Sequence, residues 1–411
     1  MVPSAALPPP SSEAAVRFLV DLARALHRYG TTAHRLENAL GLVARRLGLE
    51  AQFFSTPTAV FVSILMPTDP QTILIRVDPG QLDLGKLAEL DAVAGEVMRG
   101  DLTVTEAGWR VAEITEAPDR YGPWLTTASF ALASATAAVF FGGGWREILA
   151  GSAVGLLVGL FAWLAGGRPA VGRVFDPAAA ALASFVATLL ALWLPPLAVY
   201  TVTVSSLIVL VPGLSLTLAI SELATRDLAS GSARLAGTIM TFLAIAFGVA
   251  LGAQLAWRLG GSWPAAVTPQ GLPVWGELVA LALAPLGFVV LFRASGRDAP
   301  WIVLSGFVAF FAVRLGGSWL GPQLGAFVGA AAVGAGSNLF ARFFDRPAAV
   351  TLVPGIVFLV PGSVGFQSLS ALLERDIVSG VGTAFQMTLV ASALVTGLLV
   401  ANVVVPPRKA L

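Results

Sequence analysis

Four acidic residues lie in or at the ends of long apolar stretches, and their carboxylates are the first candidates for chemistry: Glu222, Asp227, Glu374 and Asp376. Charged side chains are costly inside a bilayer, and those found there usually bind ions or carry protons. We therefore consider them candidate proton carriers, or acceptors for a substrate ammonium group. A second interpretation stays open, because Asp227 and Asp376 each follow an arginine and can form a charge pair at the membrane surface.

The tetrapeptide Leu-Val-Pro-Gly occurs twice within apolar sequence, at residues 210–213 and 359–362. Proline removes a backbone N–H and glycine permits unusual backbone angles, so we expect a helix to break at each copy. A helix that restarts at Pro212-Gly213 or Pro361-Gly362 would present free N–H groups and a positive dipole end, which suits a substrate carboxylate. The alternative is that Pro-Gly only kinks a helix for packing.

Hydroxyl and amide side chains follow both breaks and are candidates for further substrate contacts. They are Ser215, Thr217 and Ser221 in the first copy and Ser363, Gln367 and Ser370 in the second. Three more amides lie in apolar surroundings and are candidates for lining a pathway: Gln254, Asn338 and Gln386.

The chain holds no cysteine and two histidines, which excludes disulfides, thiolate metal sites and cysteine nucleophiles. His34 and Glu37 are neighbours on one helical turn, with His27 close by. A metal site needs a further converging ligand, so we interpret these residues as polar helix surface or as a contact between domains. We predict no catalytic residue, metal or cofactor, and no basic run indicates a nucleic-acid partner.

Hydrophobic residues make up 56% of the 411-residue chain and charged residues only 12%, against roughly 25% in soluble domains. Much of the apolar surface must therefore face lipid. Residues 1–120 nevertheless hold 11 of the 25 basic and 15 of the 24 acidic residues. This uneven composition predicts a disordered tail over residues 1–12, a cytoplasmic α+β domain over residues 13–120, and a membrane part.

Hydrophobic periodicity predicts the elements of the N-terminal domain. Two amphipathic helices are expected in Ala14–Leu47 with a break at Tyr29-Gly30, and β-branched and aromatic residues predict strands in Gln52–Met66 and Thr72–Val77. Further helices are expected at Leu84–Arg99 and Thr103–Glu116.

Ten apolar stretches approach the about 20 residues that a transmembrane helix needs. They are Trp124–Gly142, Ile148–Leu164, Pro177–Leu194, Leu197–Val211, Leu235–Trp257, Glu277–Phe292, Trp301–Leu315, Leu320–Phe340, Ala348–Val360 and Gly382–Val405. With the N-terminus inside, the cytoplasmic loops and tail hold ten basic residues and the outer loops hold four. We therefore expect a multi-pass protein of the cell inner membrane with both termini in the cytoplasm.

An internal repeat divides the membrane part. A shift of 149 residues places residues 210–213 on 359–362, Arg226-Asp227 on Arg375-Asp376 and Ser230-Gly231 on Ser379-Gly380. Each repeat, 121–260 and 261–411, holds five spans, and because five is odd the second must enter the membrane from the opposite side. Many secondary transporters have such inverted repeats with the substrate between them, although channels and structural proteins can have them too.

The chain resembles the threonine/serine exporter family over nearly its full length. The N-terminal part is similar through the run of residues 29–37, Tyr-Gly-Thr-Thr-Ala-His-Arg-Leu-Glu, followed by Leu47-Gly48. The membrane part is similar through residues 210–213 with Arg226-Asp227 and Ser230-Gly231, and through their second-half counterparts. The resemblance implies a soluble domain, ten spans and export of threonine and serine driven by the proton motive force. In other members the two five-span parts are separate chains, and a dicarboxylate such as succinate is implicated.

We therefore expect a polytopic α-helical exporter of a small amino acid, with the substrate, protons and the lipid bilayer as its partners. Three alternatives stay open. The substrate can be a small dicarboxylate, the N-terminal domain can be a membrane-tethered hydrolase that uses His27, His34 and Glu37, or that domain can regulate the cytoplasmic face. The sequence leaves assembly into an oligomer of identical chains undecided.

Overall fold

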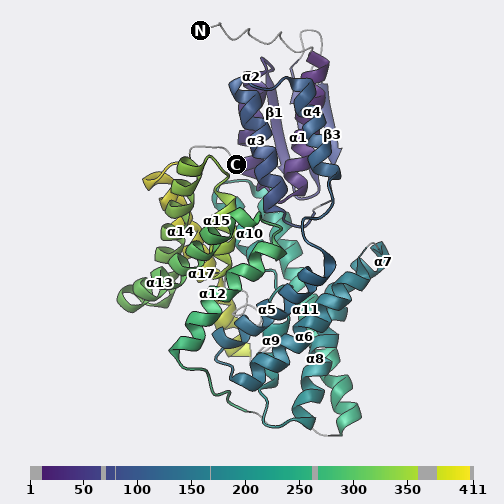
Figure 1. Cartoon of the computed structure of the whole chain (residues 1–411), viewed down its shortest axis with the longest axis vertical. Coiled ribbons are helices and arrows are strands. Elements are labelled where there is room, and N and C mark those ends of the chain that lie inside the picture. The colour runs from purple at the N-terminus through teal and green to yellow at the C-terminus, as the bar shows by residue number, and fades with distance from the viewer. Residues whose placement is uncertain are drawn as a thin grey trace.

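A computed structural model describes residues 12–65, 71–78, 80–166, 168–261, 267–359 and 377–407. The N-terminal helices and strands stack at one end of a larger body of helices (Figure 1). That N-terminal part consists of α1 (Ser12–Arg28), α2 (Ala33–Arg46), β1 (Ala51–Thr56), β2 (Ala59–Ile64), β3 (Gln71–Arg76), α3 (Leu84–Arg99) and α4 (Val104–Glu116).

The four predicted helices of the N-terminal part are confirmed, and their ends have local causes. Gly30 has a left-handed backbone (φ 97°) between α1 and α2, and Gly100 (φ 82°) ends α3. Thr103 and Glu106 form a capping box at the start of α4. The predicted strand region 52–66 is two antiparallel strands, because a turn at Pro57-Thr58 folds it back on itself.

The sheet has the order β1-β2-β3, and alternate residues of β2 point into the core. Val60, Val62 and Ile64 are fully buried there, against the apolar faces of the four helices. The same hydrophobic core extends into the helical body, where Val289 and Ile302 join it. The N-terminal part is therefore packed onto the membrane part by apolar contacts.

Eight helices of the described residues are long and apolar enough to cross a membrane. They are α5 (Pro123–Phe140), α6 (Trp145–Ala165), α8 (Phe175–Trp193), α11 (Leu228–Gly260), α12 (Val274–Leu291), α13 (Ala299–Leu320), α14 (Pro322–Phe344) and α17 (Ile377–Val404). The remaining elements are short: α7 (Pro169–Gly172), α9 (Val199–Ser206), α10 (Gly213–Ala224), the 3-10 turn η1 (Gly296–Asp298) and α15 (Ala349–Val357).

Two of the ten predicted spans contain only short helices. The stretch Leu197–Val211 holds α9 with 8 residues, and Ala348–Val360 holds α15 with 9. At 1.5 Å per residue, neither is half as long as the hydrocarbon core of about 30 Å. The first proline-glycine pair, Pro212-Gly213, thus coincides with an interruption between short helices, and the second pair lies outside the described residues.

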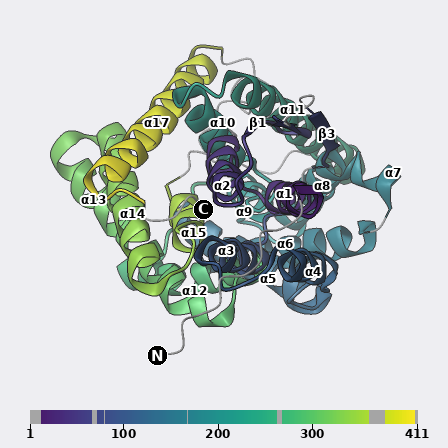
Figure 2. The same cartoon turned by 90° about the horizontal axis from the view of Figure 1, so that it is seen from above.

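The helices of the membrane part form two groups that lie side by side when seen from above (Figure 2). In one group α8 packs along α11, and in the other α14 packs along α17. The starts of α8 and α14, Phe175 and Pro322, are separated in sequence by nearly the 149 residues of the internal repeat. The short helix α10 contacts both α11 and α17, so it lies where the two groups meet.

Candidate functional site

The chain between α9 and α10 breaks at the predicted proline-glycine pair. Irregular turns follow Ser206, Pro212 is the residue that precedes α10, and the Gly213 N–H donates to the Val211 carbonyl at 2.8 Å. The predicted interruption at Pro212-Gly213 is therefore confirmed as a feature of the backbone. Its role in substrate binding stays a prediction.

The hydroxyl residues of α10 differ in their freedom to bind a substrate. Thr217 is buried, and its Oγ1 donates to the Gly213 carbonyl of its own helix at 3.2 Å. Ser215 and Ser221 are half-buried. A substrate contact by Thr217 would thus use the lone pairs of its oxygen or displace this local bond.

Glu222, near the end of α10, is the most elaborately held carboxylate of the described membrane part. It is 2% exposed, and the Arg234 guanidinium of α11 donates to both of its oxygens, at 2.9 and 3.0 Å. The Ser230 hydroxyl donates to Oε2 at 3.0 Å, and the backbone N–H of Ala33 donates to Oε1 at 3.3 Å. We call these four residues the Glu222 cluster.

Ala33 belongs to the N-terminal part, so the Glu222 cluster joins the two parts of the molecule. It is the first residue of α2, whose early N–H groups have no partner within the helix and carry the positive end of its dipole. An anionic side chain at that point is favourable for both elements. The opening turn of α2 thus contributes to the charge balance of a membrane carboxylate.

Asp227 lies beside the cluster, at the sharp connection between α10 and α11. Arg226 has a left-handed backbone (φ 68°) that allows this turn, and the Thr225 hydroxyl donates to Asp227 Oδ2 at 2.7 Å. The negative charge of Asp227 also acts on Glu37 of α2 and, together with the larger effect of burial, raises the pKa of the Glu37 carboxyl. The charge of a carboxylate in the membrane part is therefore felt by a carboxyl of the N-terminal part.

His27, His34 and Glu37 make separate structural contacts. His27 Nε2 lies 2.7 Å from the Thr56 carbonyl, and Glu37 Oε1 accepts the Ser55 N–H at 2.7 Å. His34 instead contacts Asn38 one turn along its own helix. No group of three histidine or acidic residues that could hold a metal occurs in the ranges that the structure describes.

The predicted pathway amides are dispersed. Gln254 of α11 and Gln386 of α17 are exposed. Asn338 of α14 is buried and donates to Asn402 Oδ1 at 2.9 Å and to the Val405 carbonyl at 2.7 Å, which joins α14 to α17. The second-half candidates lie outside the described residues: Pro361, Gly362, Ser363, Gln367, Ser370, Glu374 and Asp376.

The sequence did not predict the three residues that hold Glu222, which are Ala33, Ser230 and Arg234. The predicted span Leu235–Trp257 leaves Arg234 just outside the helix, whereas α11 begins at Leu228 and carries Arg234 in its second turn. The separation of 12 residues between Glu222 and Arg234, on either side of one tight turn, was a usable signal for an ion pair. Nothing in the sequence pointed to Ala33, because its contribution is a backbone N–H from a distant segment.

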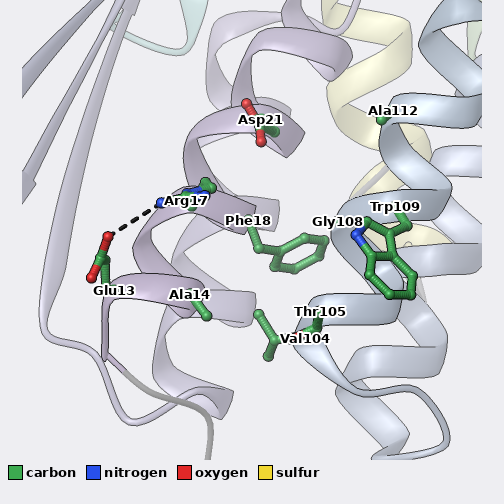
Figure 3. Close-up of a pocket in the computed structure, with 10 residues that line it drawn as sticks. All are labelled: Glu13, Ala14, Arg17, Phe18, Asp21, Val104, Thr105, Gly108, Trp109 and Ala112. Carbon is green, nitrogen blue, oxygen red and sulfur yellow. Dashed lines mark hydrogen bonds and ion pairs between the residues drawn. The ribbon is translucent and has the colours of Figure 1, made fainter.

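Two cavities occur away from the Glu222 cluster. One of about 490 Å³ lies between α1 and α4, with the exposed Trp109 beside the buried Phe18 (Figure 3). The other, of about 500 Å³, has Ser305, Ser337 and Thr351 among its lining residues. Neither contains a residue predicted to bind substrate or protons.

The set of long apolar helices is that of a multi-pass membrane protein, with an interrupted helix and a buried ion pair where the helix groups meet. Residues 17–256 match a family model for a threonine/serine exporter, and residues 277–404 match a second one described as "Threonine/Serine exporter, ThrE". The chain belongs to the threonine/serine exporter family. This family consists of transporters, so the protein is not an enzyme, and the hydrolase alternative falls.

Relatives with similar sequences occur in fungi. An uncharacterized protein of Schizosaccharomyces pombe is 25% identical over 92% of this chain and 46% of its own length. The pheromone-regulated membrane protein 10 of Eremothecium gossypii is 27% identical over 87% of this chain and 49% of its own length, and that of Yarrowia lipolytica is 27% identical over 92% and 33%. The chain thus spans half or less of the length of these relatives. No solved structure matches it.

Proposed function

We propose that the protein is a secondary transporter that exports a small amino acid of the threonine/serine type from the cytoplasm, driven by the proton motive force. Membership of the threonine/serine exporter family supports the class of substrate. The observation that carries the proposal is the interruption between α9 and α10, which ends in the buried Glu222 cluster. Interrupted helices with a polar residue at the repeat interface are the usual place for substrate and coupling ion in secondary transporters.

The proposed architecture has ten crossings in two inverted repeats, with the short segments α9–α10 and α15 each belonging to one crossing. The equivalent packing of α8 along α11 and of α14 along α17 supports this arrangement. The domain division at about residue 120, the cytoplasmic side of both termini and the inner membrane belong to the same proposal. The paired helix groups then alternate access by exchanging their positions around the centre.

In this mechanism the N–H groups that follow Gly213 in the first turn of α10 hold the substrate carboxylate, and Ser215 contributes a hydroxyl contact. Glu222 and Asp227 are the proton-coupling groups of the first half. A proton on Glu222 would neutralise its charge, and the bonds from Arg234 and from the Ala33 N–H would weaken because both rely on that charge. Proton uptake would thereby loosen α10 from α11 and from α2. The second-half candidates, including Glu374 and Asp376, take the equivalent roles.

A small dicarboxylate such as succinate is the second candidate substrate. The observation that favours it is the state of Glu222, whose two oxygens are already engaged by Arg234. The ammonium group of an amino acid would have to compete with that guanidinium for Glu222. The second carboxylate of a dicarboxylate would instead need the positive end of another helix dipole, or another arginine. The two substrates thus make opposite demands on the Glu222 cluster.

Transport in proteoliposomes tests the proposal. Vesicles that contain the purified protein are loaded with labelled threonine, and efflux is followed with and without an imposed proton gradient. Gradient-dependent efflux that unlabelled serine suppresses is the expected result. Suppression by succinate alone would favour the dicarboxylate, and no gradient-dependent flux for either substrate would refute the proposed function.

A further inference from the structure

Asp298 is a buried carboxylate outside the sites considered so far. It lies in η1, where the chain passes from α12 to α13, and it is 2% exposed. Its Oδ1 accepts a hydrogen bond from the guanidinium of Arg346, while its Oδ2 has no partner. A buried carboxylate oxygen without a partner is costly, so its retention indicates a role beyond packing.

Arg346 connects Asp298 to the short helix α15. It stands three residues before Ala349, the first residue of α15. Within α15, Val353 packs against the hydrophobic core of the N-terminal part. The Asp298–Arg346 pair therefore fixes the beginning of α15 against η1.

The first half of the membrane part has a matching arrangement around Glu147, in the first turn of α6. Glu147 is 5% exposed and accepts the N–H of Gly144 at 2.9 Å and that of Ala198 at 3.0 Å. Ala198 immediately precedes α9, the short helix that leads to the Pro212 break. In both halves a buried carboxylate at the start of the second long helix thus holds the chain just ahead of a short helix.

We propose that Glu147 and Asp298 are positioning residues for transport, each fixing the base of one short helix, and that proton uptake by Asp298 releases α15. The inference rests on the proposed transport function. Glu147 is bound by two backbone N–H groups and stays fixed. Asp298 has a free oxygen that takes a proton before the bond to Arg346 is broken, and the neutral acid then holds the guanidinium less strongly.

Three ionisable groups from neighbouring segments surround Asp298 in the described structure. Arg346 precedes α15, and Arg120 follows α4 and acts on Asp298 with its positive charge. Tyr121, beside Arg120, donates its hydroxyl to the Ala294 carbonyl at 2.7 Å. Burial, the larger influence, favours the neutral acid, whereas both arginines favour the charged carboxylate, so we expect the proposed release as the pH falls and not at alkaline pH.

The absence of native cysteine allows a direct test of α15 movement. The variant Val353→Cys, purified into nanodiscs, is labelled with a polar maleimide across about pH 5 to 8. Each labelling rate is divided by the rate for free cysteine at the same pH, because only the thiolate reacts and its fraction falls with pH. We expect labelling about tenfold faster at the acid end, a change equivalent to about 1.4 kcal/mol in the opening equilibrium. Adding Asp298→Asn should make labelling fast at every pH. Unchanged pH dependence in that double variant, or none in Val353→Cys alone, would overturn the proposal.

Two further variants separate release of α15 from loss of the fold. Asp298→Asn with Arg346→Gln replaces the ion pair by two amides that can still bond, so it decides the question if Asp298→Asn alone does not fold. We expect labelling without pH dependence, because no carboxylate remains there to take up a proton, and labelling that keeps the parental pH profile would contradict the proposal. Glu277→Gln is the matched control, because Glu277 pairs with Arg314 between α12 and α13 but both side chains are solvent-accessible.

Efflux measurements address Glu147 and keep the two proposals distinguishable. Glu147→Gln should lower threonine efflux about tenfold without changing its pH profile. Asp298→Asn should weaken the pH dependence of efflux without abolishing it, because the proposed proton-coupling groups Glu222 and Asp227 remain. If the wild-type protein exports threonine and the Glu147 and Asp298 variants export it at the same rate and with the same pH profile as Glu277→Gln, the positioning role is refuted and the transport function is not. If the wild-type protein shows no efflux but the Val353→Cys variants are labelled as expected, the proposed substrate is refuted and the proton-dependent release of α15 remains supported.

Discussion

Replacing Arg234 by Gln tests whether the Glu222 cluster is a structural tie between α10 and α11. The substitution leaves a buried carboxylate with only the Ser230 hydroxyl and the Ala33 N–H as donors. Removing one partner of a buried ion pair costs about 3–5 kcal/mol. Because the Arg234 side chain is 26% exposed and that of Glu222 only 2%, water partly screens the pair. We therefore expect the lower end, about 3 kcal/mol.

Thermal unfolding of the purified protein in detergent measures this loss. At about 2 °C per kcal/mol, the lower end of the range for large domains, the Tm should fall by about 6 °C. Arg314→Gln is the control, since it breaks a solvent-accessible pair worth at most about 1 kcal/mol. Glu222→Gln combined with Arg234→Gln should recover most of the Tm, because two amides replace the two charges.

The outcome that would refute this reasoning is specific. If Arg234→Gln melts within about 2 °C of Arg314→Gln, a difference of about 1 kcal/mol, the Glu222 cluster does not contribute as a buried pair. If the double variant melts lower than Arg234→Gln, the loss does not arise from an unpaired buried carboxylate.

Three further variants examine the contact between the parts and the helix break. Ala33→Pro removes the N–H that reaches Glu222, while proline suits the first position of a helix. Efflux should change about fivefold or more, and Ala33→Gly, which keeps the N–H, should resemble wild type. If the effects of Ala33→Pro and Glu222→Gln on efflux are additive, the two residues are not directly linked. Pro212→Ala should lower efflux about tenfold with little change in Tm, and wild-type efflux would show that the break serves packing only. Burial lowers the pKa of His27 from its ordinary 6.5, so the folded state disfavours protonation of this side chain. The contribution of neutral His27 to the free energy of unfolding is therefore complete above pH 6.5 and is lost as the pH falls through the lower pKa of the folded state. His27→Gln should therefore flatten the acid side of the Tm–pH curve, and an unchanged curve would assign the acid loss to other groups.

Local signals were sufficient for most helices. The N-terminal helices were predicted nearly to the residue because their ends use glycine, as at Gly100, or a capping box, as at Thr103. The long apolar helices followed from hydropathy, and the Pro212 break followed from the loss of a backbone N–H. Each of these features depends on neighbours in the sequence.

The contacts of the candidate site depend on tertiary structure, and there the sequence was a poor guide. The apolar window placed the start of α11 at Leu235, seven residues late, because the polar turn that carries Ser230 and Arg234 has no hydrophobic signal. Those residues are nevertheless buried or half-buried against Glu222. The N–H of Ala33 is further beyond prediction, since any residue other than proline offers the same donor.

The interactions that hold the short helices in place differ from those that hold the long helices together. Glu147 holds the start of α9, Glu222 the end of α10, and Asp298 with Arg346 the start of α15. The long helices α8, α11, α14 and α17 instead pack through small residues, as where Gly248 and Gly252 of α11 approach the backbone of α8. Close packing of this kind does not respond to protons, whereas a carboxylate bond does. A transporter that moves its short helices against fixed long ones can thus be driven by protonation without loss of its core. This division predicts that acid pH changes the reactivity of cysteines placed on α10 and α15, relative to free cysteine at the same pH, but not that of cysteines on α8.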